Sequence, residues 1–352
     1  MACLGTGHVS RPCARIPILI PQSARSMTDK PVRIRLIAMG GTIAMRSEEG
    51  RGSTPQDGAE ELAGSTPLPS GVVVERQDLT LKPSASVTLA DVADLCRAIA
   101  EAEAEGVTGV VVTHGTDTLE ETAFALGLMR RGAIPVVVTG AMRSADSIGA
   151  DGPANLANAI RVASHRDAGR HGAMVLFGDE IHAGHFVRKV HSGRPHAFSS
   201  EPYGPLGHVT EDVVRFEMAS LVDLPHLTLG ETACGRIPVV PILQAGLDLE
   251  PEAIRLFEAP EIDALVISGV GGGHVSARAA QELERLARIK PVVMTSRVGM
   301  GPTLSNTYAY AGGDIDLGKR GILNGGRWRP AQARILLQLL ISQGMRFEDL
   351  SA

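Results

Sequence analysis

Two short threonine-bearing segments contain the side chains best placed to do chemistry. One is Gly40-Gly41-Thr42-Ile43-Ala44 and the other is Thr113-His114-Gly115-Thr116-Asp117-Thr118. Each follows an apolar, β-rich run, at 32–39 and 109–112, so each threonine should lie where a strand ends. In open α/β sheets, ligands bind at the carboxyl ends of the strands. We therefore predict that Thr42 and Thr116 act together in one site, as a nucleophile and its partner.

The chemistry of these residues determines what else the site needs. A threonine hydroxyl is a weak nucleophile, so Thr42 requires a base or a hydrogen-bond relay. Thr118 and Glu121 have the spacing of a capping box, which predicts a helix that begins there. Asp117 then lies just before a helix N-terminus, a position that favours anions. Asp117 is thus suited to hold an ammonium group while the helix end holds a carboxylate, as for the α-end of an amino acid. Taken singly, the two segments are also consistent with a plain glycine turn and an Asx turn that bind nothing.

The composition excludes several classes of function. The net charge is −5 over 352 residues, whereas nucleic-acid binding needs a concentrated basic surface, so no nucleic-acid partner is expected. No apolar run reaches the roughly 18 residues of a membrane-spanning helix, so no membrane partner is expected. The cysteines lack metal-ligand spacing, and a metal site in a cluster of histidines would need the right geometry and preferably carboxylate or cysteine partners, so we expect no metal and no cofactor. Reduced cysteines favour a cytoplasmic protein. The cysteines are Cys3, Cys13, Cys96 and Cys234, and the histidines are His182, His185, His191 and His196.

The hydrophobic pattern predicts an α/β protein with two domains. From 32 to about 180, β-rich runs alternate with helical stretches, which predicts a larger N-terminal domain built on a parallel sheet with helices on both faces. Residues 181–235 are rich in His, Gly, Pro and Ser and are expected to form hairpins and a linker. A second, smaller α/β series begins at 237. The expected strands are 32–39, 79–82, 109–113, 134–139, 173–177, 237–240, 264–268 and 291–295, and the expected helices are 89–104, 119–131, 153–166, 250–258, 275–288 and 334–341.

This pattern gives four expected segments. We expect a disordered or non-native leader at 1–26, with Met27 as the natural start, because the arginine-containing leader has no acidic residue and prolines interrupt its short apolar stretch. The N-terminal domain is then 27–210, the linker 211–236 and the C-terminal domain 237–352.

The ordered set of motifs resembles the bacterial L-asparaginase family. The two threonine segments look like the two threonine signatures of that family, and further similarity lies at 140–156, 203–207 and 330–334. The resemblance covers almost everything from 32 to 343. It implies amide hydrolysis in which Thr42 attacks the side-chain amide of L-asparagine, forming an acyl-enzyme and releasing ammonia. Water would then release aspartate.

The resemblance also assigns roles to individual residues. Thr116 would orient or activate the nucleophile or the hydrolytic water, Asp117 would bind the α-amino group, and Ser84 would contact the α-carboxylate. The backbone N–H groups of Thr42 and Ala141 are candidates for the oxyanion hole, where each donor typically contributes about 2.7–4 kcal/mol. The resemblance implies a homodimer or homotetramer with sites at subunit boundaries.

The chain departs from the family pattern at several positions. Ala85 replaces a substrate-binding glutamine, and Arg166 aligns near the lysine that pairs with the motif aspartate; arginine keeps the charge but is not a base. His274 aligns near an asparagine that a neighbouring subunit supplies. The lid candidate is Arg46 to Ser53, and the stretch 47–69 lacks the usual tyrosine. Our hypothesis is that Tyr308 or Tyr310 replaces it, with aromatic packing in a hairpin as the alternative.

Three other functions stay open from the sequence. L-glutamine differs from L-asparagine by one methylene, which a pocket separates by only about 1–3 kcal/mol, so a glutaminase-asparaginase of broader specificity is one. A non-catalytic, amidotransferase-like subunit and an amino-acid sensor are the others. Release of ammonia from asparagine separates the enzyme from the last two.

Overall fold

The computed structural model describes residues 31–48, 52–55, 57–230 and 235–351. The expected leader at 1–26 and Cys234 lie outside these residues. Val32–Ala352 forms one compact unit. Within its described part, no helix has both the length and the apolar character needed to cross a membrane.

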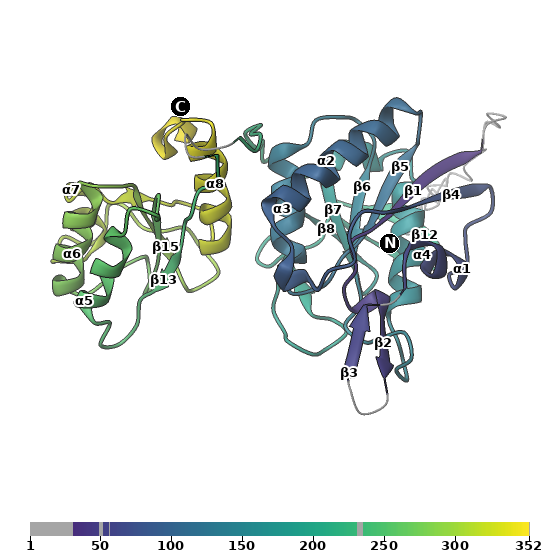
Figure 1. Ribbon diagram of the computed structural model, residues 1–352, viewed down its shortest axis with the longest axis horizontal. Coiled ribbons are helices and arrows are strands. Elements are labelled where there is room, and N and C mark those ends of the chain that lie inside the picture. Colours follow the sequence, from purple (N-terminus) through teal and green to yellow (C-terminus); the bar gives the residue numbers. More distant parts are fainter. Residues whose placement is uncertain (1–30, 49–51, 56, 231–234, 352) are drawn as a thin grey trace, which may run out of the picture. The chain divides into compact units, whose positions relative to one another are not determined.

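An eight-stranded sheet occupies residues 32–216 (Figure 1). Its strand order is β12-β11-β8-β7-β6-β5-β1-β4, in which β4, β1, β5, β6 and β7 run parallel. The expected α/β architecture is confirmed, but the sheet is mixed, because hairpins at 173–216 add three antiparallel strands at one edge. The last of these, β12, lies in the segment expected to be a linker. The bounds are β1 Val32–Ala38, β4 Val72–Asp78, β5 Gly109–Thr113, β6 Val136–Thr139, β7 Ala173–Phe177, β8 Glu180–Ala183, β11 Gly207–Thr210 and β12 Val213–Phe216.

Helices cover both faces of this sheet (Figure 1). Helices α2 (Leu89–Ala104) and α3 (Leu119–Met129) pack on one face, and α1 (Ala59–Gly64) and α4 (Gly152–Ala163) pack on the other. Strands β5 and β6 are buried along their whole length, as expected for valine-rich strands between two helical layers. The core therefore fixes the central strands whose ends carry the threonine segments.

Two of the expected strands are wrong. Residues 79–82 form a loop, and the strand is β4, whose position at the edge of the sheet accommodates the four polar residues of its second half, Glu75 to Asp78. The loop packs against Gly40: a Cβ there would lie 2.7 Å from the Lys82 carbonyl oxygen. Residues 237–240 are also outside a strand, and β13 (Ile242–Gln244) begins only after Pro241. Proline has no N–H for the strand ladder, which accounts for the later start.

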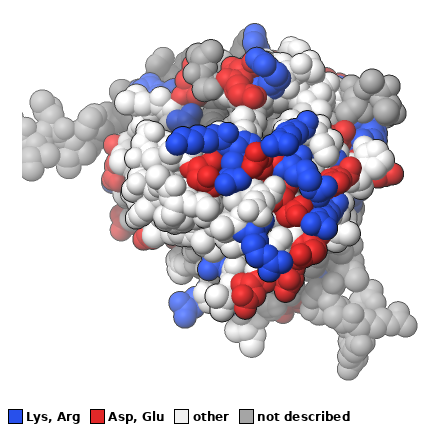
Figure 2. Space-filling view, turned by 90° about the vertical axis from the view of Figure 1, so that its left-hand side faces the viewer, with Lys and Arg blue, Asp and Glu red and all other residues white. Residues whose placement is uncertain are grey.

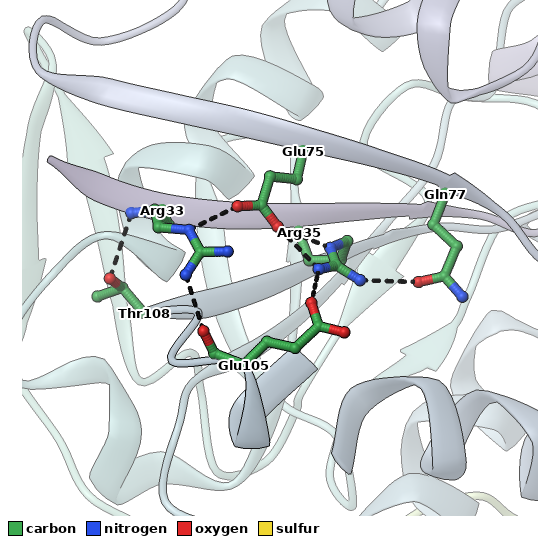
Figure 3. Close-up of polar contacts among 6 residues, drawn as sticks. All are labelled: Arg33, Arg35, Glu75, Gln77, Glu105 and Thr108. Carbon is green, nitrogen blue, oxygen red and sulfur yellow. Dashed lines mark hydrogen bonds and ion pairs between the residues drawn. The ribbon is translucent and has the colours of Figure 1, made fainter. Parts of the chain in front are cut away.

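A polar network ties the edge strand β4 to β1 (Figure 3). Arg33 and Arg35 lie two residues apart on β1, and both donate to Glu75 of β4, at 2.6 and 2.8 Å. Arg35 also donates to the Glu105 carboxylate just beyond α2, at 2.6 Å. These two arginines lower the pKa of Glu75. The network thus secures the strand that leads into the Ser84 loop.

A second sheet, entirely parallel, has the order β13-β14-β15-β16. The last helix, α8 (Pro330–Ser342), is buried on two sides. Leu336 and Leu340 join the core of α2 and α3, whereas Ala333 and Leu337 pack with residues of β14 and β15. The other elements are β14 Leu265–Gly269, β15 Val292–Ser296, β16 Leu323–Asn324, α5 Pro251–Ile254, α6 Ala277–Ala287 and α7 Asp314–Lys319.

Candidate active site

The loops that carry the expected site residues follow four adjacent parallel strands. In the register of the sheet, Ala38 of β1 pairs with Asp78 of β4 and with Thr113 of β5, and Thr113 pairs with Thr139 of β6. These strands therefore end side by side. The loops that follow them carry Ser84, Thr42, Thr116 and Ala141, in the order of the strands across the sheet.

Glycines allow the two threonine loops to touch. Gly41 has φ of 88°, and a Cβ on it would lie 2.2 Å from the Cα and N atoms of Gly115. A Cβ on Gly115 would in turn lie 2.7 Å from the Ser84 Oγ. Only glycine permits such a close approach of two backbones. Thr42 and Thr116, each next to one of these glycines, are thus carried by loops in direct contact.

Ser84 anchors the loop of the second threonine. It is only 4% exposed, and its Oγ accepts a hydrogen bond from the Asp117 N–H at 3.2 Å. The Thr118 Oγ1 donates to the Ser84 carbonyl at 2.7 Å. Thr118 is the N-cap of α3 as predicted, but the capping box does not form, because the hydroxyl has this partner and Glu121 pairs with Arg334.

The interior of the same loop is fixed by His114. The ring is fully buried, and its two nitrogens lie 2.8 Å from the Gly115 carbonyl oxygen and 3.0 Å from the Thr122 Oγ1. Burial lowers the pKa of His114. The neutral ring can donate to one of these partners and accept from the other, so it braces the turn that presents Thr116.

Lys189 is the cation that meets the second threonine segment. Its Nζ lies 2.9 Å from the Thr116 Oγ1 and 2.7 Å from the Asp117 Oδ1. The lysine side chain is 17% exposed and the aspartate side chain 69%. The expectation that Arg166 takes this place is wrong: Arg166 is 87% exposed and pairs with Asp167. Lysine, unlike arginine, can lose its proton, which changes what the site can do.

The Ala141 loop is held by side chains of α4 and its N-cap. Asp151 accepts hydrogen bonds from the backbone N–H groups of Met142 and Arg143, at 3.0 and 2.9 Å. Asn155 donates to the Gly140 carbonyl at 3.0 Å. Ala141 itself is fully buried. Neither its N–H nor that of Thr42 donates to any group among the residues that the structure describes.

The lid candidate is a hairpin of β2 (Met45–Glu48) and β3 (Gly52–Pro55), with 49–51 outside the described residues. At its base the Arg46 Nε donates to Asp57 at 2.8 Å. This hairpin follows the Thr42 turn directly.

The two candidate tyrosines belong to a different cluster, in the C-terminal part of the chain. The Tyr310 hydroxyl lies 3.0 Å from the His274 Nδ1, and the His274 Nε2 lies 3.5 Å from Asp314. Tyr308 and Tyr310 are 43% and 53% exposed, so both offer surface to a neighbour.

The clustered histidines have partners of other kinds. His182 and His185 bond to the hydroxyls of Ser200 and Ser220, and burial lowers the pKa of each to about 4. His191 accepts from backbone N–H groups of its own turn. Among the described residues, no three His, Cys, Asp or Glu side chains gather as a metal site would require.

An open hollow of about 470 Å³ lies beside the lysine. It is lined by Asp117, Glu120, Lys189, Val190, His191 and Ser192. A carboxylate, an ammonium and a hydroxyl that contact one another next to an open space form an arrangement suited to binding a small zwitterion and moving a proton.

Sequence reasoning missed Lys189. It lies 72 residues from Asp117 on the two-residue strand β9 (Arg188–Lys189), within the segment interpreted as hairpins. One signal was present: the chain has few lysines, and this one is alone in a long stretch without another.

Comparisons with known proteins identify the family of the chain. A model of the asparaginase N-terminal domain matches residues 33–221, and one of the glutaminase/asparaginase C-terminal domain matches 239–352. A "Probable L-asparaginase" of Deinococcus radiodurans is 37% identical, covering 90% of this chain and 95% of the relative. A "Glutaminase-asparaginase" of Pseudomonas fluorescens is 31% identical over 77% of each chain. The crystal structure of a "Probable Cytoplasmic L-asparaginase" from Campylobacter jejuni superposes with a TM-score of 0.76 at 30% identity, covering 88% of this chain and 95% of that one. The chain therefore belongs to the asparaginase family, whose members are amidohydrolases.

Proposed function

We propose that the protein hydrolyses the side-chain amide of L-asparagine to L-aspartate and ammonia, with Thr42 as the nucleophile. The observation that carries the proposal is the contact of Lys189 with both Thr116 and Asp117, on a loop whose Gly115 touches the Gly41 beside Thr42. The names of the relatives support the same substrate.

The first half of the proposed reaction forms an ester. The Thr42 Oγ attacks the amide carbon, the carbon–nitrogen bond breaks, and the hydroxyl proton of Thr42 passes to the departing nitrogen, which leaves as ammonia. Thr116 and Lys189 form the relay for this proton, because a threonine hydroxyl needs such help to act as a nucleophile. The free N–H groups of Thr42 and Ala141 stabilise the negative oxygen of the intermediate.

The second half restores the enzyme. Water attacks the ester carbon, the bond to Thr42 breaks, and one proton of the water returns to the Thr42 Oγ as aspartate leaves. In the proposed binding mode Asp117 holds the substrate ammonium with the carboxylate oxygen that Lys189 leaves free. Ser84, which fixes the backbone of Asp117, lies on the side of the α-carboxylate.

A glutaminase-asparaginase activity of broader specificity is the second candidate function. Ala85 lacks the amide that would contact the amino acid, and one relative is named a glutaminase-asparaginase. Ammonia release from asparagine and from glutamine, measured side by side for the wild type and Thr42→Ala, decides between them. A wild type inactive on both amides would instead favour a sensor or a non-catalytic subunit.

For the missing lid tyrosine we propose Tyr308 or Tyr310, acting within a homodimer or homotetramer. Their partial exposure and their place on a C-terminal loop support a role towards another copy of the chain. Turnover of Tyr308→Phe, Tyr310→Phe and the double variant, with the oligomeric state measured for each, tests this. Wild-type turnover in all three would rule it out.

We also propose a cytoplasmic location. The similar Campylobacter protein is named as cytoplasmic, and Cys96 forms no disulfide within the described part of the chain. Cell fractionation of the native host tests the location.

A further inference from the structure

We propose that Glu120 and Arg329 are positioning residues that hold Lys189 against Thr116 and Asp117. The inference rests on the proposed function, in which Lys189 serves the nucleophile. It concerns two charged side chains outside the threonine segments, one on α3 and one at the start of α8.

Lys189 needs external support because its own strand is minimal. β9 has two residues and pairs only with β10 (Phe198–Ser199). The Glu120 carboxylate accepts a hydrogen bond from the backbone N–H of Lys189. Glu120 lies three residues after Asp117, in the first turn of α3. One short stretch of chain therefore holds both ends of this lysine, its backbone through Glu120 and its ammonium through Asp117.

Arg329 fixes the chain just before the lysine. Its two terminal nitrogens donate to the carbonyl oxygens of Phe186, at 2.9 Å, and Val187, at 2.7 Å. Gln332, one turn into α8, donates to the preceding carbonyl, that of His185, at 2.9 Å. The planar fork of a guanidinium suits two neighbouring carbonyls, whereas a lysine ammonium acts as a point charge. Three successive carbonyls that lead to Lys189 are thus held from α8.

Glu120 and Arg329 also support each other electrostatically. Burial raises the pKa of Glu120, and the charge of Glu121 raises it further. The hydrogen bond from the Lys189 N–H and the charges of Arg329 and Arg188 lower this pKa. Burial likewise lowers the pKa of Arg329, against the attraction of Glu120. Loss of either side chain leaves the other buried with less compensation, so both variants should displace the same segment.

The chain offers a matched control in the neighbouring residue. Glu121 also lies on α3, but its carboxylate pairs with Arg334 of α8, whereas that of Glu120 accepts from the Lys189 backbone. Glu121→Ala therefore removes a bond between α3 and α8 without the effect on the lysine. Glu120→Gln keeps an oxygen acceptor for the Lys189 N–H but loses the charge opposite Arg329.

Kinetics give the first test. We expect Glu120→Ala and Arg329→Gln to lower kcat for asparagine on the order of ten- to a hundredfold with KM changed little, because a small displacement of a catalytic group has effects of this size. Glu120→Gln should recover part of the loss and Glu121→Ala should stay within twofold of wild type. In a Lys189→Met background, Glu120→Ala should have little further effect. An undiminished loss in that background, or equal losses for the two glutamates, would overturn the proposal.

A second readout does not depend on turnover. The only lysines are Lys30, Lys82, Lys189, Lys290 and Lys319, so protein labelled with ¹³C at lysine Cε gives few signals, and Lys189→Met assigns the one of interest. We expect this signal to move in Glu120→Ala and Arg329→Gln and to stay in place in Glu121→Ala, with thermal unfolding showing that each variant is folded. An unmoved signal in folded Glu120→Ala contradicts the inference, whereas a moved signal in a protein that releases no ammonia contradicts only the proposed function.

Discussion

The two sheets of this protein both carry glycine-rich loops after a parallel strand, but the glycines of these loops meet different neighbours. After β1, Gly40 and Gly41 allow the Lys82 and Gly115 backbones to approach, and Thr42 follows. After β14, the space around Gly272 and Gly273 is filled by the side chains of Leu304 and Thr303. A glycine-rich loop alone therefore does not make a site. The loop after β1 differs because its glycines meet the backbone of a loop whose Asp117 is paired with Lys189.

Charges in the two regions differ in the same way. At the candidate active site, one lysine meets one aspartate and one threonine beside an open hollow. On the outer face of α6, basic and acidic side chains alternate and neutralise one another (Figure 2). Arg285 there pairs with both Glu258 and Glu282, and Arg320 pairs with both Glu284 and Asp316. These pairs are satisfied within the surface and leave nothing for a substrate.

The largest difference between the regions should appear when matched hydroxyls are removed. Thr42→Ala should lower kcat for asparagine at least about a thousandfold, because it removes the nucleophile. Ser296→Ala, at the end of β15, removes a hydrogen bond to the Gly271 carbonyl and one from the Val298 N–H, and should stay within twofold of wild type. Steady-state ammonia release checks both. Comparable losses from the two variants would end the distinction between the loops.

Substitutions of the loop glycines should have the next largest effect. Gly41→Ala forces a side chain into the Gly115 backbone at positive φ, so we expect the free energy of unfolding to fall by about 3 kcal/mol or more, with loss of activity. At Gly272 the added methyl group meets the flexible Leu304 side chain, so Gly272→Ala should cost only about 1 kcal/mol. Urea unfolding of each variant measures this order, and equal costs would argue against the loop contact.

Acid should destabilise the protein through a buried histidine of the larger sheet, His182 of β8. Burial lowers the pKa of His182 to about 4, below its unfolded value near 6.5, so the unfolded chain takes up a proton in this window and the folded protein does not. The contribution of His182 to stability should be complete above pH 6.5 and fall by about 1 kcal/mol per pH unit towards pH 4, and His185 should add a similar fall. His182→Asn should reduce this slope, measured by urea unfolding between pH 7 and 4.5. An unchanged slope would show that other groups control the acid response.

The smallest effect is expected on the outer face of α6. Arg285→Ala breaks ion pairs in an exposed network, and such pairs contribute little in water. We expect Tm to change by no more than about 2 °C and turnover to stay at the wild-type level. A larger fall in Tm would show that the charge network stabilises the second sheet.

Local patterns were enough to predict most of the fold. The valine-rich runs of β5 and β6 and the apolar stripe of α2 are properties of short segments, and the structure has these elements close to the expected residues. The order of the threonine segments also predicted loops at one edge of the sheet. The strand expected at 79–82 was wrong because β4 ends in four polar residues, whereas the loop after it alternates apolar and polar residues as a strand would.

The remainder depended on contacts between distant parts of the chain. Lys189 reaches Asp117 only because antiparallel strands turn the chain back towards the first loops, and a two-residue strand has no local signature. Arg166 was expected in its place from alignment alone. The capping box of α3 failed for a similar reason: the Thr118 hydroxyl has a distant partner, the Ser84 carbonyl, which its spacing to Glu121 does not reveal.

The most direct test of the proposed mechanism is to trap the ester on Thr42. Wild-type protein is mixed with excess asparagine, quenched rapidly in acid and digested, and the peptides are weighed by mass spectrometry. The proposed mechanism predicts an aspartyl adduct on the peptide that contains Thr42, absent from Thr42→Ala. An adduct on a different residue, or full turnover by Thr42→Ala, would contradict it.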